Sequence, residues 1–388
     1  MNPSSKNWLK EYDLYYTHLK TTSDYKIISE DDIYEVLFRS SLLFLVPLEP
    51  SSVLHPDFGN WNIKEKIKII FTHYLFQLTD LYLSKSTNSS DFSEVYNRLI
   101  EVEQTSLSTE AYIDHLIDGK KDSWLLNAYN INPWIFLVLI RFYFLLKGEI
   151  LDNRQIQMDI LKGMFAASNV DNIISNNEKR LLKRYIENGN FSEKDKLFLY
   201  QYPNFDASNN KESKVQTVIN KISYDLALFA LMSNKKISDR EHFFIDECAQ
   251  KLSISVDQQH RTFSWIQKIY LHHYQELPHL RNTYSFSSIK NVANHNLTFL
   301  LKKNSKMIVN EIKESKELIV LLRKSTDKEL STEEKAKIRE QILDLLKTIP
   351  SLTIFMIPGG TIILPILMKI LPEDLLYPSS FINKNAKD

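Results

Sequence analysis

The longest charge-free run of the chain, residues 348–368, restricts its fold more than any other stretch. Its 21 residues match the roughly 20 that a helix needs to cross a hydrocarbon core. However, Pro350, Pro358 and Pro365 each lack a backbone N–H, and Gly359 and Gly360 follow the middle proline. The run therefore divides into two short apolar pieces. It forms either a kinked membrane span or a re-entrant or soluble helical hairpin, because broken backbone needs other groups to satisfy it.

The composition predicts an all-α protein. Among 388 residues, 43% are hydrophobic and only 7 are glycine, and the long segments are rich in Leu, Ile, Lys and Glu. The 48 basic and 48 acidic residues cancel, so no overall field draws the chain onto nucleic acid. Cys248 is the single cysteine, which excludes an intramolecular disulfide and a multi-cysteine zinc site.

Helix signals divide the chain into four segments. We expect an N-terminal helical domain over 1–150, a repeat domain over 151–280, a long amphipathic linker helix within 285–330 and a C-terminal segment over 331–388. In the first segment, 63–83 is a strong helical pattern, and Asn132 and Pro133 precede an apolar helix over 134–146. In the third, one amphipathic helix is predicted over 287–325.

An internal repeat is visible in the second segment. Ser175 with Glu178, and Ser238 with Glu241, both form the pattern of a capping box, in which serine and glutamate satisfy N–H groups of a helix start. The two patterns are 63 residues apart. A further helix start follows each by seventeen residues, at Ser192 and Ser255. The economical explanation is a duplicated pair of helices.

The C-terminal part, from Ser331 to Phe381, resembles the membrane segment of the leucine-zipper, EF-hand-containing transmembrane (LETM) proteins. The matching features are a charged amphipathic helix that runs into Ile349 and Pro350, the apolar run with its internal proline, and then Leu364-Pro365, Lys369, Pro372 and Pro378-Ser-Ser-Phe381. The likeness is closest to bacterial proteins described as LETM-related and biofilm-associated. It covers only about the last 50 residues.

This resemblance implies a membrane-associated protein linked to biofilm formation or cell-envelope behaviour. A second hypothesis, taken from the mitochondrial members, is a component of cation/proton exchange and ion homeostasis. In that case Lys369 and the Pro358-Gly359-Gly360 break line an ion path, and Pro350 and Pro365 are further membrane or ion-path candidates. Otherwise Lys369 marks the membrane boundary. In the mitochondrial members a large ribosome-binding domain follows the membrane segment, whereas this sequence stops at Asp388, so ribosome binding is not expected to carry over. An EF-hand is not expected to carry over either.

The repeat region resembles the bacterial TerB-like tellurite-resistance helical domain more weakly. That pattern places Asp-Gly before the helix start and Glu in its first turn. Asp171 with Glu178 fits the first copy in part, and Glu241 fits the second without the aspartate. The three residues are weak candidates for a metal site in a soluble metal- or stress-sensing module. The alternative is that Glu178 and Glu241 only cap helices.

No glycine-rich phosphate loop, nucleophile elbow or paired-histidine zinc helix occurs in the sequence, so we expect a non-enzymatic protein without a cofactor. The charged, tyrosine-rich N-terminus is unlike a signal peptide. We therefore expect the body at the cytoplasmic face of the bacterial inner membrane, held by the C-terminal segment, or else free in the cytoplasm. The expected partners are membrane lipid, and a protein partner or a second copy of the chain, but not nucleic acid.

Overall fold

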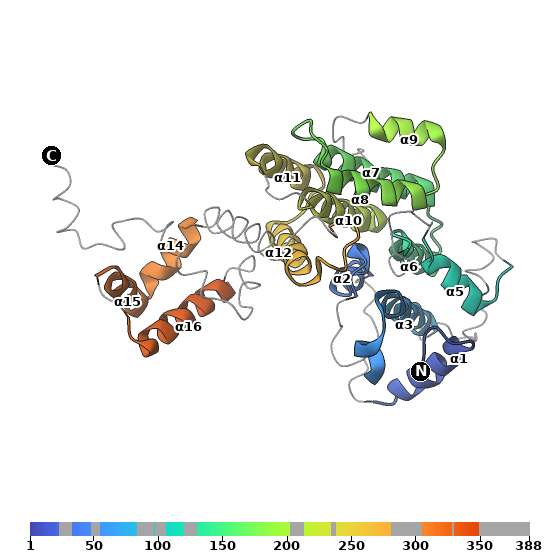
Figure 1. Cartoon of the computed structure of the whole chain (residues 1–388), viewed down its shortest axis with the longest axis horizontal. Coiled ribbons are helices and arrows are strands. Elements are labelled where there is room, and N and C mark those ends of the chain that lie inside the picture. The colour runs from blue at the N-terminus through green and yellow to red at the C-terminus, as the bar shows by residue number, and fades with distance from the viewer. Residues whose placement is uncertain are drawn as a thin grey trace. The chain divides into compact units, whose positions relative to one another are not determined.

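The computed structural model describes residues 1–22, 33–47, 55–83, 97, 106–119, 130–201, 213–233, 238–280, 305–327 and 330–348. Within these ranges the secondary structure is helical, which confirms the all-α prediction, and the one β-type pairing is an isolated bridge between Asp118 and Ile131. The chain divides into two compact units (Figure 1). Unit 1 comprises 1–234, 239–254 and 273–281, and unit 2 comprises 235–238, 255–272 and 282–388.

The N-terminal part of unit 1 is built around two apolar helices. The first is α3 (Ile63–Leu83), whose bounds agree with the predicted pattern. The second is α6 (Ile135–Leu145), in which nine residues are buried. The Asn132 side chain accepts the backbone N–H of Trp134 at 3.0 Å, but the helix begins later than predicted: its N-cap is Trp134, which makes no side-chain cap hydrogen bond. The surrounding elements are α1 (Trp8–Leu19), α2 (Ile33–Arg39), η1 (Leu42–Phe44), η2 (Pro56–Asn60) and α5 (Thr109–Ile117).

The helices of the repeat have the predicted spacing. Helices α8 (Asn176–Asn188) and α11 (Asp239–Lys251) each have 13 residues and begin 63 residues apart. Helices α9 (Glu193–Tyr200) and α12 (Val256–His273) also begin 63 residues apart. Each set follows another helix, α7 (Asn153–Ser168) or α10 (Lys214–Leu231). In unit 1, α7 packs along α10, and both α8 and α11 contact this central pair.

Buried contacts join the N-terminal helices to the repeat, so the boundary predicted at residue 150 falls inside unit 1. The Tyr34 hydroxyl on α2 donates to the carboxylate of Asp225 on α10 at 2.7 Å. The indole N–H of Trp134 donates to the backbone oxygen of Tyr185 on α8 at 2.8 Å. Satisfied polar groups of this kind fix how the helices pack, because an unmet hydrogen bond in the interior is costly.

In unit 2, the described part of the expected 287–325 helix is two helices and not one. Helix α14 (Ser305–Glu314) ends before Ser315, and α15 (Lys316–Asp327) begins after it. The Ser315 hydroxyl accepts the backbone N–H of Leu318 at 3.3 Å, so this serine caps a new helix where the prediction placed a helix interior. Helix α16 (Thr332–Thr348) follows and contacts both α14 and α15.

Candidate functional site

The candidate residues of the sequence analysis fall into two groups in the structure. Asp171, Glu178 and Glu241 lie within the described ranges. The membrane and ion-path candidates Pro350, Pro358, Gly359, Gly360, Pro365 and Lys369 lie outside them, as does the apolar run beyond Thr348.

Asp171 and Glu178 both serve the turn that precedes α8. The Asp171 carboxylate accepts the backbone N–H of Ile173 at 2.9 Å, beside Asn172 in the left-handed backbone region at φ 63°. Glu178 accepts the N–H of Ser175 at 2.8 Å, and the Ser175 hydroxyl accepts the N–H of Glu178 at 3.3 Å. This reciprocal pair is the predicted capping box, and the Glu178 side chain is fully buried. Helix capping therefore accounts for the position of Glu178.

Glu241 occupies the equivalent place in the first turn of α11 and is also buried. Across the described ranges, no three His, Cys, Asp or Glu side chains are grouped so that they could hold a metal ion. Cys248, seven residues further along α11, is buried, and burial raises the pKa of its thiol to about 12. A protonated, buried thiol packs as a small apolar side chain and is not a nucleophile.

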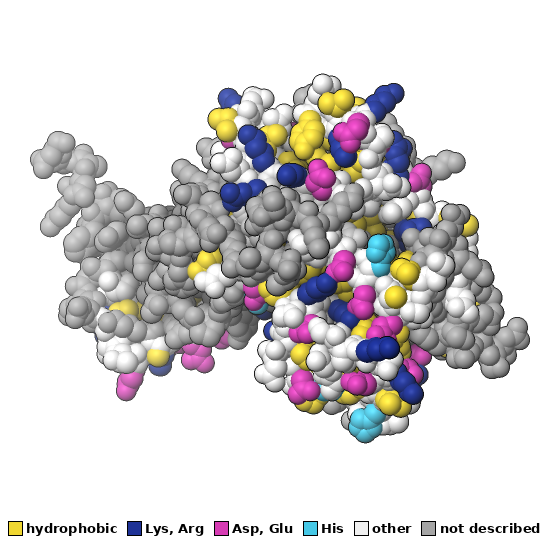
Figure 2. Space-filling model, turned by 45° about the vertical axis from the view of Figure 1, so that its right-hand side comes forward, with side chains coloured by type: hydrophobic (Ala, Val, Ile, Leu, Met, Phe, Trp, Pro, Cys, Tyr) yellow, Lys and Arg dark blue, Asp and Glu magenta, His cyan; other side chains and the backbone are white. Residues whose placement is uncertain are grey.

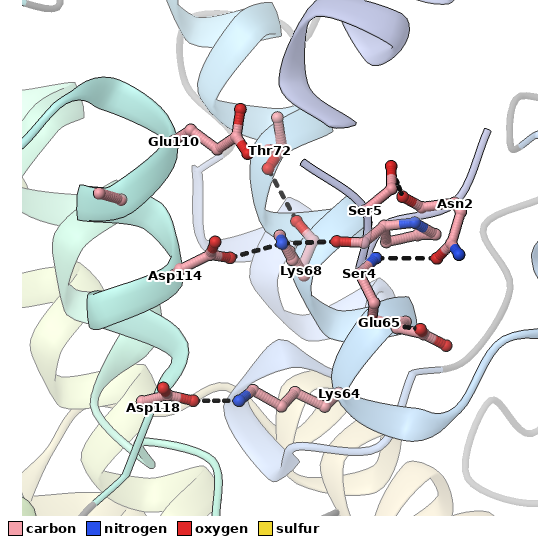
Figure 3. A network of polar contacts seen from close by, with 12 residues as sticks. Asn2, Ser4, Ser5, Lys64, Glu65, Lys68, Thr72, Glu110, Asp114 and Asp118 are labelled. Carbon is pink, nitrogen blue, oxygen red and sulfur yellow. Dashed lines mark hydrogen bonds and ion pairs between the residues drawn. The ribbon is translucent and has the colours of Figure 1, made fainter. Parts of the chain in front are cut away.

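A polar network in the described part of unit 1 was not predicted from the sequence. It joins α3 to α5 and to the first residues of the chain (Figure 3). Lys68 pairs with Asp114 at 2.5 Å, and Lys64 pairs with Asp118. The two lysines are four residues apart along α3, and the two aspartates are four residues apart at α5, so there is one ion pair per helical turn. Because the earlier lysine pairs with the later aspartate, the two helices run antiparallel. The spacing is visible in the sequence, but nothing local indicates that α3 and α5 are neighbours.

Lys68 is the centre of this network, and its side chain is 8% exposed. Its ammonium donates to the backbone oxygen of Pro3 at 2.6 Å and lies 3.9 Å from the centre of the Trp8 ring. Burial lowers the pKa of Lys68, and the Asp114 and Glu110 carboxylates oppose that shift. These contacts hold the N-terminal segment against α3, which is a structural role.

Helices α15 and α16 form an antiparallel pair that delivers the chain to the apolar run. Glu317 on α15 accepts from the Gln341 side chain on α16 at 2.8 Å, while Lys324 pairs with Glu334 at the other end. Ser331 and Glu334 form a reciprocal capping box at the start of α16, with N···O distances of 3.0 and 3.2 Å. The buried side chains of α16 include Ile338 and Ile342. The helix therefore has one face anchored on α15.

Comparison with protein families gives one match. Residues 330–388 match the family described as LETM1-like, RBD. The matched stretch begins just before α16 and includes the whole of the charge-free run. Neither the curated proteins nor the solved structures contain a match to this chain. The C-terminal segment is thus LETM1-like, as the resemblance indicated, and the match does not extend to the helices of unit 1.

None of the described helices combines the length and the apolarity that a membrane crossing requires. Helix α3 is long enough, with 21 residues, but it carries several lysines and glutamate in its first turns. The run at 349–368 lies beyond the last described residue, so this finding does not concern it.

Proposed function

We propose that this chain is a non-enzymatic, membrane-associated protein of the LETM-related type, whose C-terminal segment contacts lipid. The observation that carries the proposal is the LETM1-like match over 330–388, because it includes the 21-residue charge-free run. That run has about the length of a membrane span. Its prolines divide it, so the backbone at the break needs partners from the protein or from water.

The geometry of α16 supports this proposal. The helix begins at a capping box, is held to α15 by polar contacts, and ends at Thr348, which is the first residue of the run. It therefore fixes the position of the residue at which the apolar run begins. Lys337 and Glu340 are exposed on α16, so part of its surface remains available to a protein partner or to a second copy of the chain.

The proposal includes a location and a biological role. We place the body at the cytoplasmic face of a bacterial inner membrane, since cations precede the run more often than they follow it. A link to biofilm formation or to cell-envelope behaviour is proposed from the resemblance. Nucleic acid is not a proposed partner, because the charges of the chain balance.

Membrane fractionation of the full chain tests the proposal. Wild-type protein should stay in the membrane pellet after a carbonate wash. The double variant Phe355→Lys and Ile363→Lys places a charge on each side of the Pro358 break and should be released. A lysine at the centre of a span costs roughly 3 kcal/mol. The control is Val320→Lys, at a side chain on α15 that is 64% exposed; it should stay in the pellet. Release of the wild-type protein by carbonate would contradict the proposal.

A second candidate function is a component of cation/proton exchange. It is favoured by Lys369, a cation placed directly after the run, together with the Pro358-Gly359-Gly360 break within it. Purified protein in vesicles that contain a pH-sensitive dye should then show cation-dependent proton flux. Lys369→Ala should abolish that flux, and Lys384→Ala should preserve it. Vesicles that show no flux with the wild-type protein would exclude this function.

The third hypothesis, a TerB-like metal or stress sensor, has no supporting observation among the described residues. Asp171 and Glu178 make the local hydrogen bonds of a turn and a helix cap.

A further inference from the structure

Helix α9 is held firmly along its inner side. Arg154 on α7 donates two hydrogen bonds to the Asp195 carboxylate, one of them from Nε at 3.1 Å. This pairing holds the pKa of Asp195 at about 2. Leu199 is completely buried, and the Tyr200 ring meets the edge of Phe165 with the ring centres 5.5 Å apart. The orientation of α9 is therefore fixed, and so is the set of side chains that it turns outward.

The outward side of α9 is unusually apolar. Leu197 is 62% exposed, Phe198 is 47% exposed and Tyr200 is 58% exposed. Ten large hydrophobic side chains are exposed in the described part of the chain, and these three occupy four consecutive residues. Single exposed hydrophobic residues are normal, but a group of them marks an interaction surface. We call these three residues the α9 tip.

Exposed cations are frequent on α8 and α9, and two of them, Lys183 and Lys196, act on Tyr200 of the α9 tip. Lys179 and Lys183 lie four residues apart on the exposed side of α8, and Lys194 is exposed on α9. The charges of Lys183, Lys196 and Glu187 act on the Tyr200 hydroxyl, whose pKa is raised mainly by burial. The exposed or half-exposed cations of α8 and α9 are Lys179, Arg180, Lys183, Lys194 and Lys196, and the carboxylates beside them are Glu187 and Glu193. The exposed surfaces of α8 and α9 therefore carry more cations than carboxylates.

Figure 2 shows hydrophobic side chains next to Lys and Arg side chains over the upper part of the molecule, with some Asp and Glu side chains among them, at the height where Figure 1 places α9. Apolar and aromatic side chains flanked by lysines are the arrangement by which helices lie on anionic membranes. The apolar groups enter the boundary between headgroups and acyl chains, while the ammonium groups remain with the phosphates.

We propose that the α9 tip, together with the lysines of α8 and α9, docks on an anionic lipid surface. This inference deepens the proposed membrane association and rests on it, since a chain held at a bilayer by its C-terminal segment has its body close to the headgroups. Positive charge at the tip complements a negatively charged leaflet, and this complementarity selects lipid over an apolar protein groove as the partner. The contact is peripheral, and it adds to any anchoring by the C-terminal segment.

A fluorescent label at the tip tests the proposal in the full chain. Leu197→Cys introduces an exposed thiol, whereas the native Cys248 is buried and remains unlabelled. A polarity-sensitive fluorophore at residue 197 is mixed with vesicles of phosphatidylglycerol and phosphatidylcholine, or of phosphatidylcholine alone. The matched control is the same label at Phe243→Cys on α11, where the native side chain is 73% exposed.

With anionic vesicles, the label at residue 197 should shift to the blue and become protected from aqueous iodide, and the label at residue 243 should change in neither respect. Adding Lys183→Glu and Lys194→Glu should lower the affinity for vesicles reported by the label by about 30-fold or more, since each lysine near an anionic surface favours binding about fivefold. Added salt should weaken the response in the same direction.

The outcomes separate this inference from the proposed function. A carbonate-resistant protein whose label at residue 197 does not respond would overturn the docking of α9 and leave the C-terminal anchor intact. A carbonate-released protein whose label still responds to anionic vesicles would overturn the anchor and retain the docking. An equal response with phosphatidylcholine alone would show nonspecific adsorption and overturn the preference for anionic lipid. A fluorescence shift that depends on protein concentration without vesicles would show that a second copy of the chain occupies the tip.

Discussion

Two buried histidines of unit 1 should make its stability fall steeply between pH 7 and pH 5. His73 on α3 is 4% exposed and shares a 2.9 Å hydrogen bond with the Tyr12 hydroxyl. His279 is 2% exposed and packs against Phe229, with the ring centres 5.3 Å apart. Burial lowers the pKa of His73 from 6.5 to about 4. Burial, with the nearby cations Arg184 and Arg180, lowers that of His279 to about 3.

The sign and size follow from these values. Both histidines are neutral in the folded state and take up protons more readily when unfolded, so their contribution to stability is complete above pH 6.5 and is lost as the pH falls. Each histidine has a pKa of 6.5 in the unfolded state and of about 3 to 4 in the folded state. At pH 5 this difference lowers the free energy of unfolding by about 2 kcal/mol for each histidine. Unit 1 should therefore lose about 4 kcal/mol of unfolding free energy. Asp195, with its pKa at about 2, titrates below this window.

Urea unfolding at pH 7 and pH 5, followed by the fluorescence of the buried Trp8 and Trp134, measures this loss. The double variant His73→Gln and His279→Gln has a lower stability at pH 7 but should show a much smaller difference between the two pH values. The control is His18→Gln, because His18 is exposed on α1. An equal pH dependence in the wild type and in the double variant would refute the reasoning that both imidazoles are buried in the neutral state.

Three further stability predictions concern local contacts, each checked by thermal or urea unfolding of the full chain. Ser175→Ala should cost about 1 kcal/mol by removing the α8 cap, and adding divalent cations should not change that cost. Asp114→Ala should cost about 2 kcal/mol, because it leaves the buried Lys68 ammonium without its carboxylate. Lys68→Met should cost less, because the Asp114 that it leaves unpaired is 47% exposed; a larger cost for Lys68→Met would contradict this. Gly119→Ala should cost about 1–3 kcal/mol, since its Cβ would lie 2.9 Å from the Ile131 carbonyl carbon. An unchanged unfolding midpoint for Gly119→Ala would show that the Ile131 backbone yields freely.

Helix starts were the feature best predicted from the sequence. The capping boxes at Ser175 and Ser331 are present, and the helices of the two repeat copies begin 63 residues apart. Both features depend on groups within a few residues of each other, so a local pattern is sufficient to identify them. Ser315 shows the limit of such reasoning. Its hydroxyl caps α15, but in the sequence it interrupts an amphipathic pattern that continues on both sides.

The candidate sites were predicted less well, because their surroundings depend on packing. The sequence identifies Glu178 and Glu241 as first-turn glutamates, but their burial follows from the contacts of α8 and α11 with the central helices. Similarly, Leu197 and Tyr200 have ordinary helical spacing. Their exposure follows from the tertiary packing, which places Asp195 and Leu199 on the inner side of α9. The sequence pattern alone does not distinguish these exposed apolar residues from the apolar residues of a buried helix face.

The sequence alone determined the helical class, the helix caps, the repeat and the LETM-like character of the C-terminal segment, because each is encoded in neighbouring residues. Only the tertiary structure decided which helices meet. Tyr34 reaches Asp225 across 191 positions, and Lys68 reaches Asp114 across α3 and α5. Such partners are chosen by how apolar faces pack, and the energy of a buried charge or hydrogen bond then depends on the partner that packing provides.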